Sequence, residues 1–322
     1  MKRELVMRII DAVKPKQIED ESISVRRITH IPVKISDDFK PIGPAQSSSV
    51  LFIDGGNQEI ISTPGISLQF IRTYYTIYKG NRRIKTRKEE FYALIQLDDD
   101  KIASAEFFDS KIFTEVLSLE LDDFNPSVST LGNLVRRLSE LRLAKLSCGE
   151  SDYIVLDGSF FAPTRIEQEF VKGLLHSAQE KGTKLAALSK TSSLVTDRGR
   201  SVQTAIRNNA PDGCWIFPLI GLDDPRYKAE LSLVKLHQRS QYIFILETQG
   251  DDPSAILKEN STDPVFRGYP YGLIEADQFA RVSNAERDMF RMAFLAKAGN
   301  AFKELLEAEN ALNAHSILDA IR

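Results

Sequence analysis

The sequence predicts an α/β protein in which helices flank a mixed β-sheet. Two observations predict this fold class. Residues 50–97 hold three segments rich in β-branched and aromatic residues, which is typical of antiparallel strands. Residues 153–190 read as strand, helix and strand, which implies two parallel strands joined by a right-handed crossover. An additional β-hairpin and a C-terminal helical region complete the prediction.

Composition restricts the function classes. The chain has 322 residues, of which 42% are hydrophobic, and its net charge is −3, with 42 Lys and Arg against 45 Asp and Glu. This balance excludes a globally basic nucleic-acid binder, so a nucleic acid would have to be held by local patches. The 2 cysteines and 4 histidines lack the spacing of zinc ligands, and so few cysteines favour a reducing compartment, the cytoplasm. No apolar run is long enough to cross a membrane.

The chain divides at residue 49 in this prediction. Residues 1–49 form an N-terminal helix, which stops before Pro15, and an extended connection, whereas residues 50–322 form one domain. Its first strand is the short apolar run at 50–53. The next strands are predicted at 66–80 and 91–97, with the basic segment between them at a hairpin tip.

Helical spacing follows in residues 111–121 and 130–146. A buried strand at 153–157 then leads into a helix whose start carries a capping box, Thr164 and Glu167, and whose end is marked by Gly182. The remaining elements are a strand at 184–190, a β-hairpin formed by 228–236 and 241–248, and a mostly helical region at 276–322.

This order of a three-strand meander, helices and a βαβ unit is the connectivity of the RNase H-like fold. In that fold the first and fourth strands are parallel neighbours, so Asp54 and Asp157 should lie side by side where these two strands end. Gly55 and Gly158 would let the backbone turn away and leave room for a ligand. Two adjacent carboxylates repel each other unless a cation or a proton intervenes, and oxygen ligands without histidine or cysteine favour Mg²⁺ or Mn²⁺. Taken singly, each aspartate is more readily explained as a turn residue; the pair on adjacent parallel strands favours the metal site.

An ordered set of segments runs through most of the chain: FIDGGN at 52–57, LDGSF at 156–160, LSKTS at 188–192 and YPYGLIEADQFARVS at 269–283. In these segments and their order, the sequence resembles the NurA family of nucleases. The resemblance implies an RNase H-like core, manganese-dependent DNA cleavage and a homodimer. It also implies 5′–3′ exonuclease activity on single- and double-stranded DNA, endonuclease activity on single strands, and work with the HerA hexameric ATPase in double-strand break resection.

The resemblance also implies roles for individual residues. Asp54 and Asp157 would be metal ligands, and Glu106 would be the intervening acidic ligand, with Asp109 as its competitor. Lys190 would offset charge on the scissile phosphate. Asp277 stands where many members carry histidine, so it could bind metal or handle protons, or it could be only a helix N-terminal charge.

Two groups of side chains are candidates for DNA binding. The basic segment could grip phosphates through Arg82, Arg83, Lys85 and Arg87, although such a hairpin tip is more often simply solvated. Phe160 and Phe161 directly follow the proposed metal site and could stack on unpaired bases, with core packing as the alternative.

Two rival functions fit parts of the pattern. Actin-like ATPases and sugar kinases also repeat a strand-Asp-Gly loop, but here residues 156–170 pass through two phenylalanines directly into a helix, and no Walker lysine loop occurs. Nucleotide hydrolysis without DNA cleavage would favour that class. The other rival is a non-catalytic DNA-binding scaffold subunit, against which the presence of Asp54, Glu106 and Asp157 argues.

Overall fold

The computed structural model describes residues 3–13, 22–25, 29–34, 38–99, 101–120, 128–190, 195–196, 201–207, 210–219 and 229–299. Eleven strands in this part of the chain form one sheet, in the order β3-β12-β13-β14-β10-β9-β4-β5-β6-β7-β8. A separate three-stranded sheet has the order β11-β1-β2. The strands are β1 (Ser22–Val25), β2 (Thr29–Lys34), β3 (Lys40–Pro41), β4 (Ser49–Thr63), β5 (Ile66–Lys79), β6 (Arg82–Leu97), β7 (Ile102–Phe108), β8 (Leu117–Glu120), β9 (Tyr153–Asp157), β10 (Lys184–Ser189), β11 (Val195–Thr196), β12 (Trp215–Leu219), β13 (Glu230–Lys235) and β14 (Phe244–Gln249).

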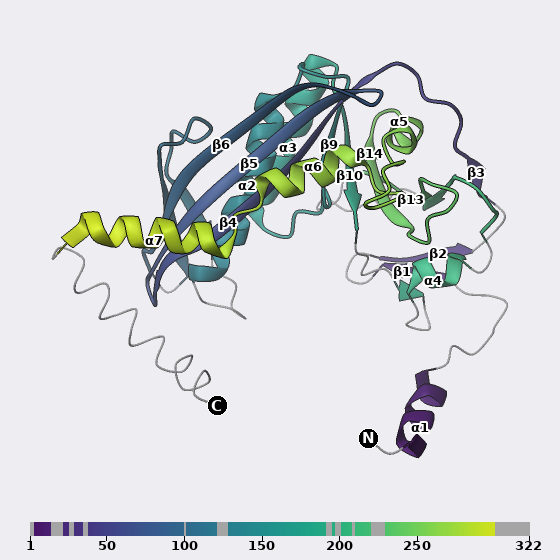
Figure 1. Cartoon of the computed structure of the whole chain (residues 1–322), viewed down its shortest axis with the longest axis horizontal. Coiled ribbons are helices and arrows are strands. Elements are labelled where there is room, and N and C mark those ends of the chain that lie inside the picture. The colour runs from purple at the N-terminus through teal and green to yellow at the C-terminus, as the bar shows by residue number, and fades with distance from the viewer. Residues whose placement is uncertain are drawn as a thin grey trace.

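Helices cover both faces of the large sheet (Figure 1). They are α1 (Arg3–Val13), α2 (Leu131–Leu146), α3 (Arg165–Lys181), α4 (Val202–Arg207), α5 (Ser254–Glu259), α6 (Tyr271–Ala280) and α7 (Asn284–Ala298), with a 3-10 turn at Val128–Thr130. On one face, α2 and α3 enclose the larger hydrophobic core, which includes Leu51, Ile53 and Leu156. On the other face, α5 and α6 pack on a second core that includes Phe52 and Val155. Alternate residues of β4 and β9 therefore face different layers.

The mixed pairing at the centre of the sheet confirms the predicted RNase H-like class. β4 pairs antiparallel with β5, which pairs antiparallel with β6. On its other edge β4 pairs parallel with β9, and β9 pairs parallel with β10. The predicted hairpin is formed by β13 and β14, and β14 joins the sheet beside β10.

The predicted α3 is confirmed with both of its ends. The Thr164 hydroxyl accepts a hydrogen bond from the Glu167 amide, the Glu167 carboxylate accepts from the Thr164 amide, and Gly182 adopts a left-handed conformation with φ 66°. Each feature satisfies backbone groups that the helix itself leaves unpaired. The predicted order of strand, helix and strand over residues 153–190 is confirmed by β9, α3 and β10.

Three predictions about elements are wrong. The helix expected at 111–121 is instead a turn, in which the Ser110 hydroxyl accepts from the Ile112 and Phe113 amides, followed by strand β8. The basic segment is not a hairpin tip, because β6 is continuous from Arg82 and pairs with β5 along its length. β4 does not end at residue 53 but continues to Thr63. Residues 300–322 of the expected C-terminal helices lie outside the described residues.

Within the described residues, every helix is too short or too polar to cross a membrane.

Candidate metal centre

Asp54 and Asp157 lie next to each other on parallel strands, as the sequence predicts. The pairing of β4 with β9 places Ile53 opposite Leu156, so the next residue on each strand is an aspartate. Both aspartates extend the side of their strand that carries Phe52 and Val155, which is the face covered by α6. β9 stops at Asp157, where Gly158 turns the chain away with φ 126°.

A third carboxylate reaches this pair from α6. One carboxylate oxygen from each of Asp54, Asp157 and Asp277 lies within 4.8 Å of the others. Gly272 allows this approach, because a Cβ at that position would lie 2.0 Å from the Phe52 ring. α6 can therefore sit directly on β4, and its carboxylate reaches the edge of the sheet.

The two glycines after Asp54 allow close packing on both faces of β4 and do not form a turn, which corrects the sequence-based interpretation. A Cβ on Gly55 would lie 2.8 Å from a carboxylate oxygen of Glu140, on the α2 side. A Cβ on Gly56 would lie 2.3 Å from the Ala280 carbonyl oxygen, on the α6 side. At Gly56 the nearest atom is backbone, so a side chain there would force α6 away from β4, whereas at Gly55 a side chain would displace the Glu140 carboxylate.

Lys190 and Tyr269 complete the polar surroundings of Asp157. The Lys190 ammonium lies 2.7 Å from Asp157 Oδ2 and 3.6 Å from Asp277 Oδ1. The Tyr269 hydroxyl donates a hydrogen bond of 3.0 Å to Asp157 Oδ1, and the Lys190 ammonium lies 5.0 Å from the centre of its ring. Tyr269 is buried and was not among the sequence candidates, although it begins the segment YPYGLIEADQFARVS that carries the resemblance.

Glu140 on α2 is a second functional candidate that the sequence analysis missed. It is buried behind Gly55, and its carboxylate forms ion pairs with Arg136, on Oε1, and with Arg137 at 3.2 Å. Arg136 also donates a hydrogen bond to the Gly55 carbonyl. The spacings i, i+3 and i, i+4 are those of an ordinary polar helix face. Glu140 reaches the site only because α2 packs closely on β4 at Gly55, which has no side chain.

The electrostatics of the cluster favour a bound cation. Burial, reinforced by the neighbouring charges of Glu140 and Asp157, raises the pKa of Asp54 to about 8. Burial also raises the pKa of Glu140, although its two arginines oppose that shift. Burial would lower the pKa of Lys190, but the Asp157 carboxylate more than compensates and raises it. A divalent cation would relieve the repulsion among these carboxylates.

The donor set suits a hard divalent metal ion. Asp54, Asp157 and Asp277 offer carboxylate oxygens from three elements within the span of one coordination sphere. Neither histidine nor cysteine belongs to this group in the described residues. Oxygen-only ligation is typical of Mg²⁺, Mn²⁺ and Ca²⁺ and unlike a zinc site.

The structure does not bring Glu106 to this cluster. Glu106 is exposed on β7, which is three strands from β4, or about 14 Å across the sheet. The strand registers place Asp54 opposite Tyr74 and Lys88, whereas Glu106 lies opposite Leu94, about 20 Å further along β6. Its competitor Asp109, with φ 60°, follows the same distant strand. An acidic ligand between Asp54 and Asp157 in the chain is better matched by Glu140.

Most charges of the predicted DNA-binding segment are neutralised within the protein. Arg83 pairs with the buried Glu275, Lys85 with Glu150, and Arg87 with Glu89, at 3.1, 2.7 and 2.8 Å. Arg82 is exposed at the start of β6. Because ion-paired groups have little net charge to offer, the segment is a weaker phosphate-binding surface than its sequence indicates.

The two phenylalanines after Asp157 differ in their surroundings. Phe160 is 1% exposed and belongs to the core between the sheet and α2–α3. Its backbone amide donates to the buried Glu247 carboxylate. Phe160 therefore has no free face for a nucleobase, and that prediction is wrong. Phe161 is half-buried and packs against the same core.

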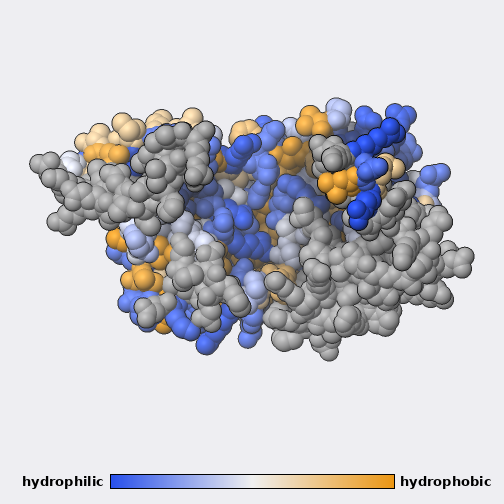
Figure 2. Space-filling view, turned by 90° about the horizontal axis from the view of Figure 1, so that it is seen from below, coloured by the Kyte–Doolittle hydropathy of each residue, from blue (hydrophilic) through white to orange (hydrophobic). Residues whose placement is uncertain are grey.

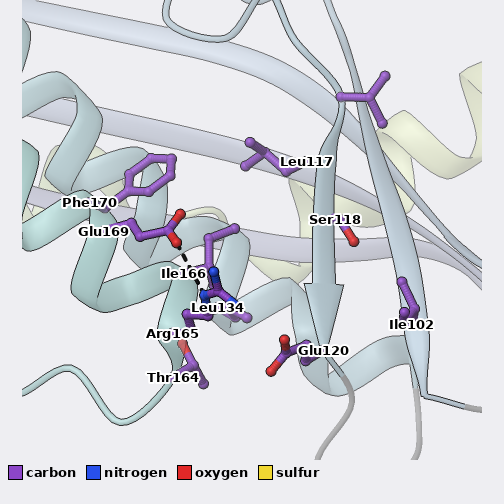
Figure 3. Close-up of a pocket in the computed structure, with 11 residues that line it drawn as sticks. Ile102, Leu117, Ser118, Glu120, Leu134, Thr164, Arg165, Ile166, Glu169 and Phe170 are labelled. Carbon is purple, nitrogen blue, oxygen red and sulfur yellow. Dashed lines mark hydrogen bonds and ion pairs between the residues drawn. The ribbon is translucent and has the colours of Figure 1, made fainter.

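A groove of about 420 Å³ opens at the carboxylate cluster. Its lining residues are Asp54, Gly55, Gly56, Asn57, Gln58, Arg136, Asp277, Arg281 and Val282. A different pocket, of about 340 Å³, lies between β8 and α3, where Leu117, Ile166 and Phe170 form its apolar wall (Figure 3). Arg165 and Glu169 form an ion pair beside that wall, and Glu120 is the remaining charged residue of the lining, so this pocket has no cluster of carboxylates. The groove at the cluster is the better candidate for a reaction site.

The fold and the site together define the class of this protein. It has a mixed RNase H-like sheet, with three carboxylates that converge near its centre. Residues 48–196 match the family model of the NurA domain. That match includes Asp54, Glu140, Asp157 and Lys190, whereas Asp277 lies beyond it.

Solved structures of similar fold include two described as NurA. The NurA nuclease from Sulfolobus solfataricus is 13% identical, with a TM-score of 0.53 over 92% of this chain and 98% of that chain. A crystal structure of NurA bound to dAMP and manganese is 10% identical, with a TM-score of 0.53 over 81% of this chain and 91% of that chain. No curated protein matches the sequence. The chain is therefore similar to the NurA family in the sequence of residues 48–196 and in its fold over most of its length.

Proposed function

We propose that the protein is a metal-dependent deoxyribonuclease. The observation that carries this proposal is the convergence of Asp54, Asp157 and Asp277, whose carboxylate oxygens lie within 4.8 Å of one another at the end of a groove. These residues would hold one or two Mn²⁺ or Mg²⁺ ions. Bound there, the metal would lower the pKa of water and stabilise charge on the phosphodiester. The two NurA crystal structures described with manganese support Mn²⁺ as one of these ions.

The protein's own groups would orient and balance the reacting atoms. Lys190 lies beside Asp157 and Asp277, so its ammonium can offset the negative charge that develops on the scissile phosphate. Tyr269 fixes the orientation of Asp157 through its hydroxyl hydrogen bond. Glu140 pairs with two arginines, one of which donates to the Gly55 carbonyl, so this buried group holds α2 against β4 beside Asp54.

The finer features of the proposal rest on the resemblance to the family. They are 5′–3′ exonuclease activity on single- and double-stranded DNA, endonuclease activity on single strands, and action in DNA end resection with a HerA-type ATPase. A homodimer and a cytoplasmic location belong to the same proposal.

The test is cleavage of end-labelled single- and double-stranded DNA by the purified protein in Mn²⁺, Mg²⁺ or chelator. We expect cleavage with metal, none with chelator, and none from Asp157→Ala, whereas DNA binding by that variant survives. Asp251→Ala is the matched control, because Asp251 is an exposed aspartate that pairs with Lys184 at the start of β10, away from the cluster.

Three outcomes would count against the proposal. Near-normal cleavage by Asp157→Ala would remove the mechanism. DNA binding with no metal-dependent cleavage by the wild type would indicate the scaffold alternative, and nucleotide hydrolysis without cleavage would indicate the ATPase alternative.

A further inference from the structure

One edge of β4 is free beyond the carboxylate cluster. β9 pairs with β4 only as far as Ile53, whereas β4 continues to Thr63 and remains paired with β5 on its other edge. From Asp54 onward, no strand of the described chain covers the edge that β9 leaves. This free edge, residues 55–58, is the floor of the groove that begins at the cluster.

The walls of this groove come from the two faces of the sheet. Arg136 of α2 stands on one side, and its guanidinium donates to the Gly55 carbonyl on the floor. The end of α6 and the residues after it, Arg281 and Val282, stand on the other side. The Gln58 side-chain amide donates to the Val282 carbonyl at 3.1 Å and so ties the floor to this wall. The groove is therefore built from backbone and side chains that hold one another in place.

Arg281 is the unneutralised cation of the groove. Its side chain is exposed, and no carboxylate in the described part of the chain pairs with it. Its amide donates to the Asp277 carbonyl, so it lies one helical turn beyond a residue of the cluster. Arg136, in contrast, shares its charge with the buried Glu140. A free guanidinium beside a carboxylate cluster attracts a phosphate that the carboxylates alone would repel.

We propose that this groove holds the sugar–phosphate backbone of one unpaired DNA strand next to the scissile phosphate, with Arg281 binding a phosphate. The inference rests on the proposed nuclease function and deepens it. The strand is unpaired because Asp54 is only 8% exposed and lies between helices on both faces of the sheet, where the second strand of a duplex would collide with α2 or α6.

The test is the salt dependence of binding of a fluorescent single-stranded oligonucleotide in chelator, where no cleavage occurs. Loss of one phosphate contact lowers the magnitude of the slope of log K against log salt by about 0.7 for a single strand. We expect this decrease for Arg281→Ala and a nearly normal slope for Arg281→Lys. Lys181→Ala, which removes one exposed charge at the far end of α3, is the control and should leave the slope unchanged.

Neutral methylphosphonate linkages, placed singly along the oligonucleotide, locate the contact. One linkage should weaken binding to the wild type but not to Arg281→Ala, because the two changes remove the same interaction. The proposal that Arg281 binds a phosphate in this groove would be overturned if Arg281→Ala and Lys181→Ala gave equal slopes. It would also be overturned if no single neutral linkage weakened binding to the wild type while leaving binding to Arg281→Ala unchanged. Absence of metal-dependent cleavage would instead overturn the proposed function, since binding is measured without metal.

Discussion

Replacing Asp54 by asparagine tests whether burial really keeps a proton on this carboxyl group. Its pKa is raised from 3.8 to about 8 by burial first, then by the nearby charges of Glu140 and Asp157. The Gly55 amide donates to Asp54 Oδ1 at 2.7 Å, and an asparagine carbonyl can accept the same hydrogen bond. The substitution therefore removes the titration and leaves the shape of the site intact.

The sign of the effect follows from proton binding. Between about pH 4 and about pH 8, the folded protein keeps a proton on Asp54 that the unfolded chain has lost. The wild type therefore loses stability as the pH rises, by about 1.4 kcal/mol per pH unit and about 5 kcal/mol over the whole interval. The stabilisation that comes from the proton on Asp54 is fully present below about pH 4 and is absent from Asp54→Asn. As the pH rises, the free energy of unfolding of the wild type therefore falls relative to that of the variant.

The assay is urea unfolding of both proteins in chelator, at a series of pH values across this interval. We expect the difference in free energy of unfolding to change steadily with pH in favour of the variant. Added Mn²⁺ at the highest pH should stabilise the wild type more than the variant, because a ligand stabilises the state that binds it. Two parallel stability curves would refute the reasoning, since they would mean that Asp54 ionises in the fold as it does in water.

Further predictions concern the neighbours of Asp54. Lys190→Met should lower the cleavage rate by about 100-fold or more, yet tighten Mn²⁺ binding measured by calorimetry, because the ammonium competes for the same carboxylates; weaker binding would contradict this. Gly56→Ala should cost about 1–3 kcal/mol of stability in urea unfolding and weaken Mn²⁺ binding, since the new methyl group would strike the Ala280 carbonyl. Gly43→Ala, where the Cβ has open space, is its control, and equal stabilities would show that α6 does not press on β4. Glu140→Ala should destabilise the fold by about 3–5 kcal/mol, because it leaves two arginines without their buried partner; unchanged urea unfolding would show that those arginines find other partners.

The central pair of carboxylates could be predicted because its signal is local. A buried run followed by Asp-Gly occurs twice, and a meander followed by a βαβ unit places the two runs side by side. The register of β4 with β9 then depends on the alternation of buried side chains, which the sequence also contains. Asp277 could be suggested only by resemblance, since its place depends on how closely α6 approaches β4.

The residues whose positions were predicted wrongly are placed by tertiary packing, which the local sequence does not specify. Glu106 looks like Glu140 in a sequence, because both are acidic residues between the two aspartates. Nothing local states that β7 lies three strands away, or that Gly55 leaves space for a carboxylate from α2. The basic segment of β6 was predicted as a hairpin tip because it is polar and lies between two apolar segments, but the partners of Arg83 and Lys85, Glu275 and Glu150, come from elsewhere in the chain.

The residues that match the NurA domain model do not make a complete folding or functional unit. The match ends at residue 196, yet β14, which covers the outer edge of β10, begins at Phe244. A fragment limited to 48–196 would expose an apolar strand edge, a known route to aggregation. The same fragment would lack Tyr269 and Asp277, so recombinant versions of this protein should extend at least through α7, the last described helix.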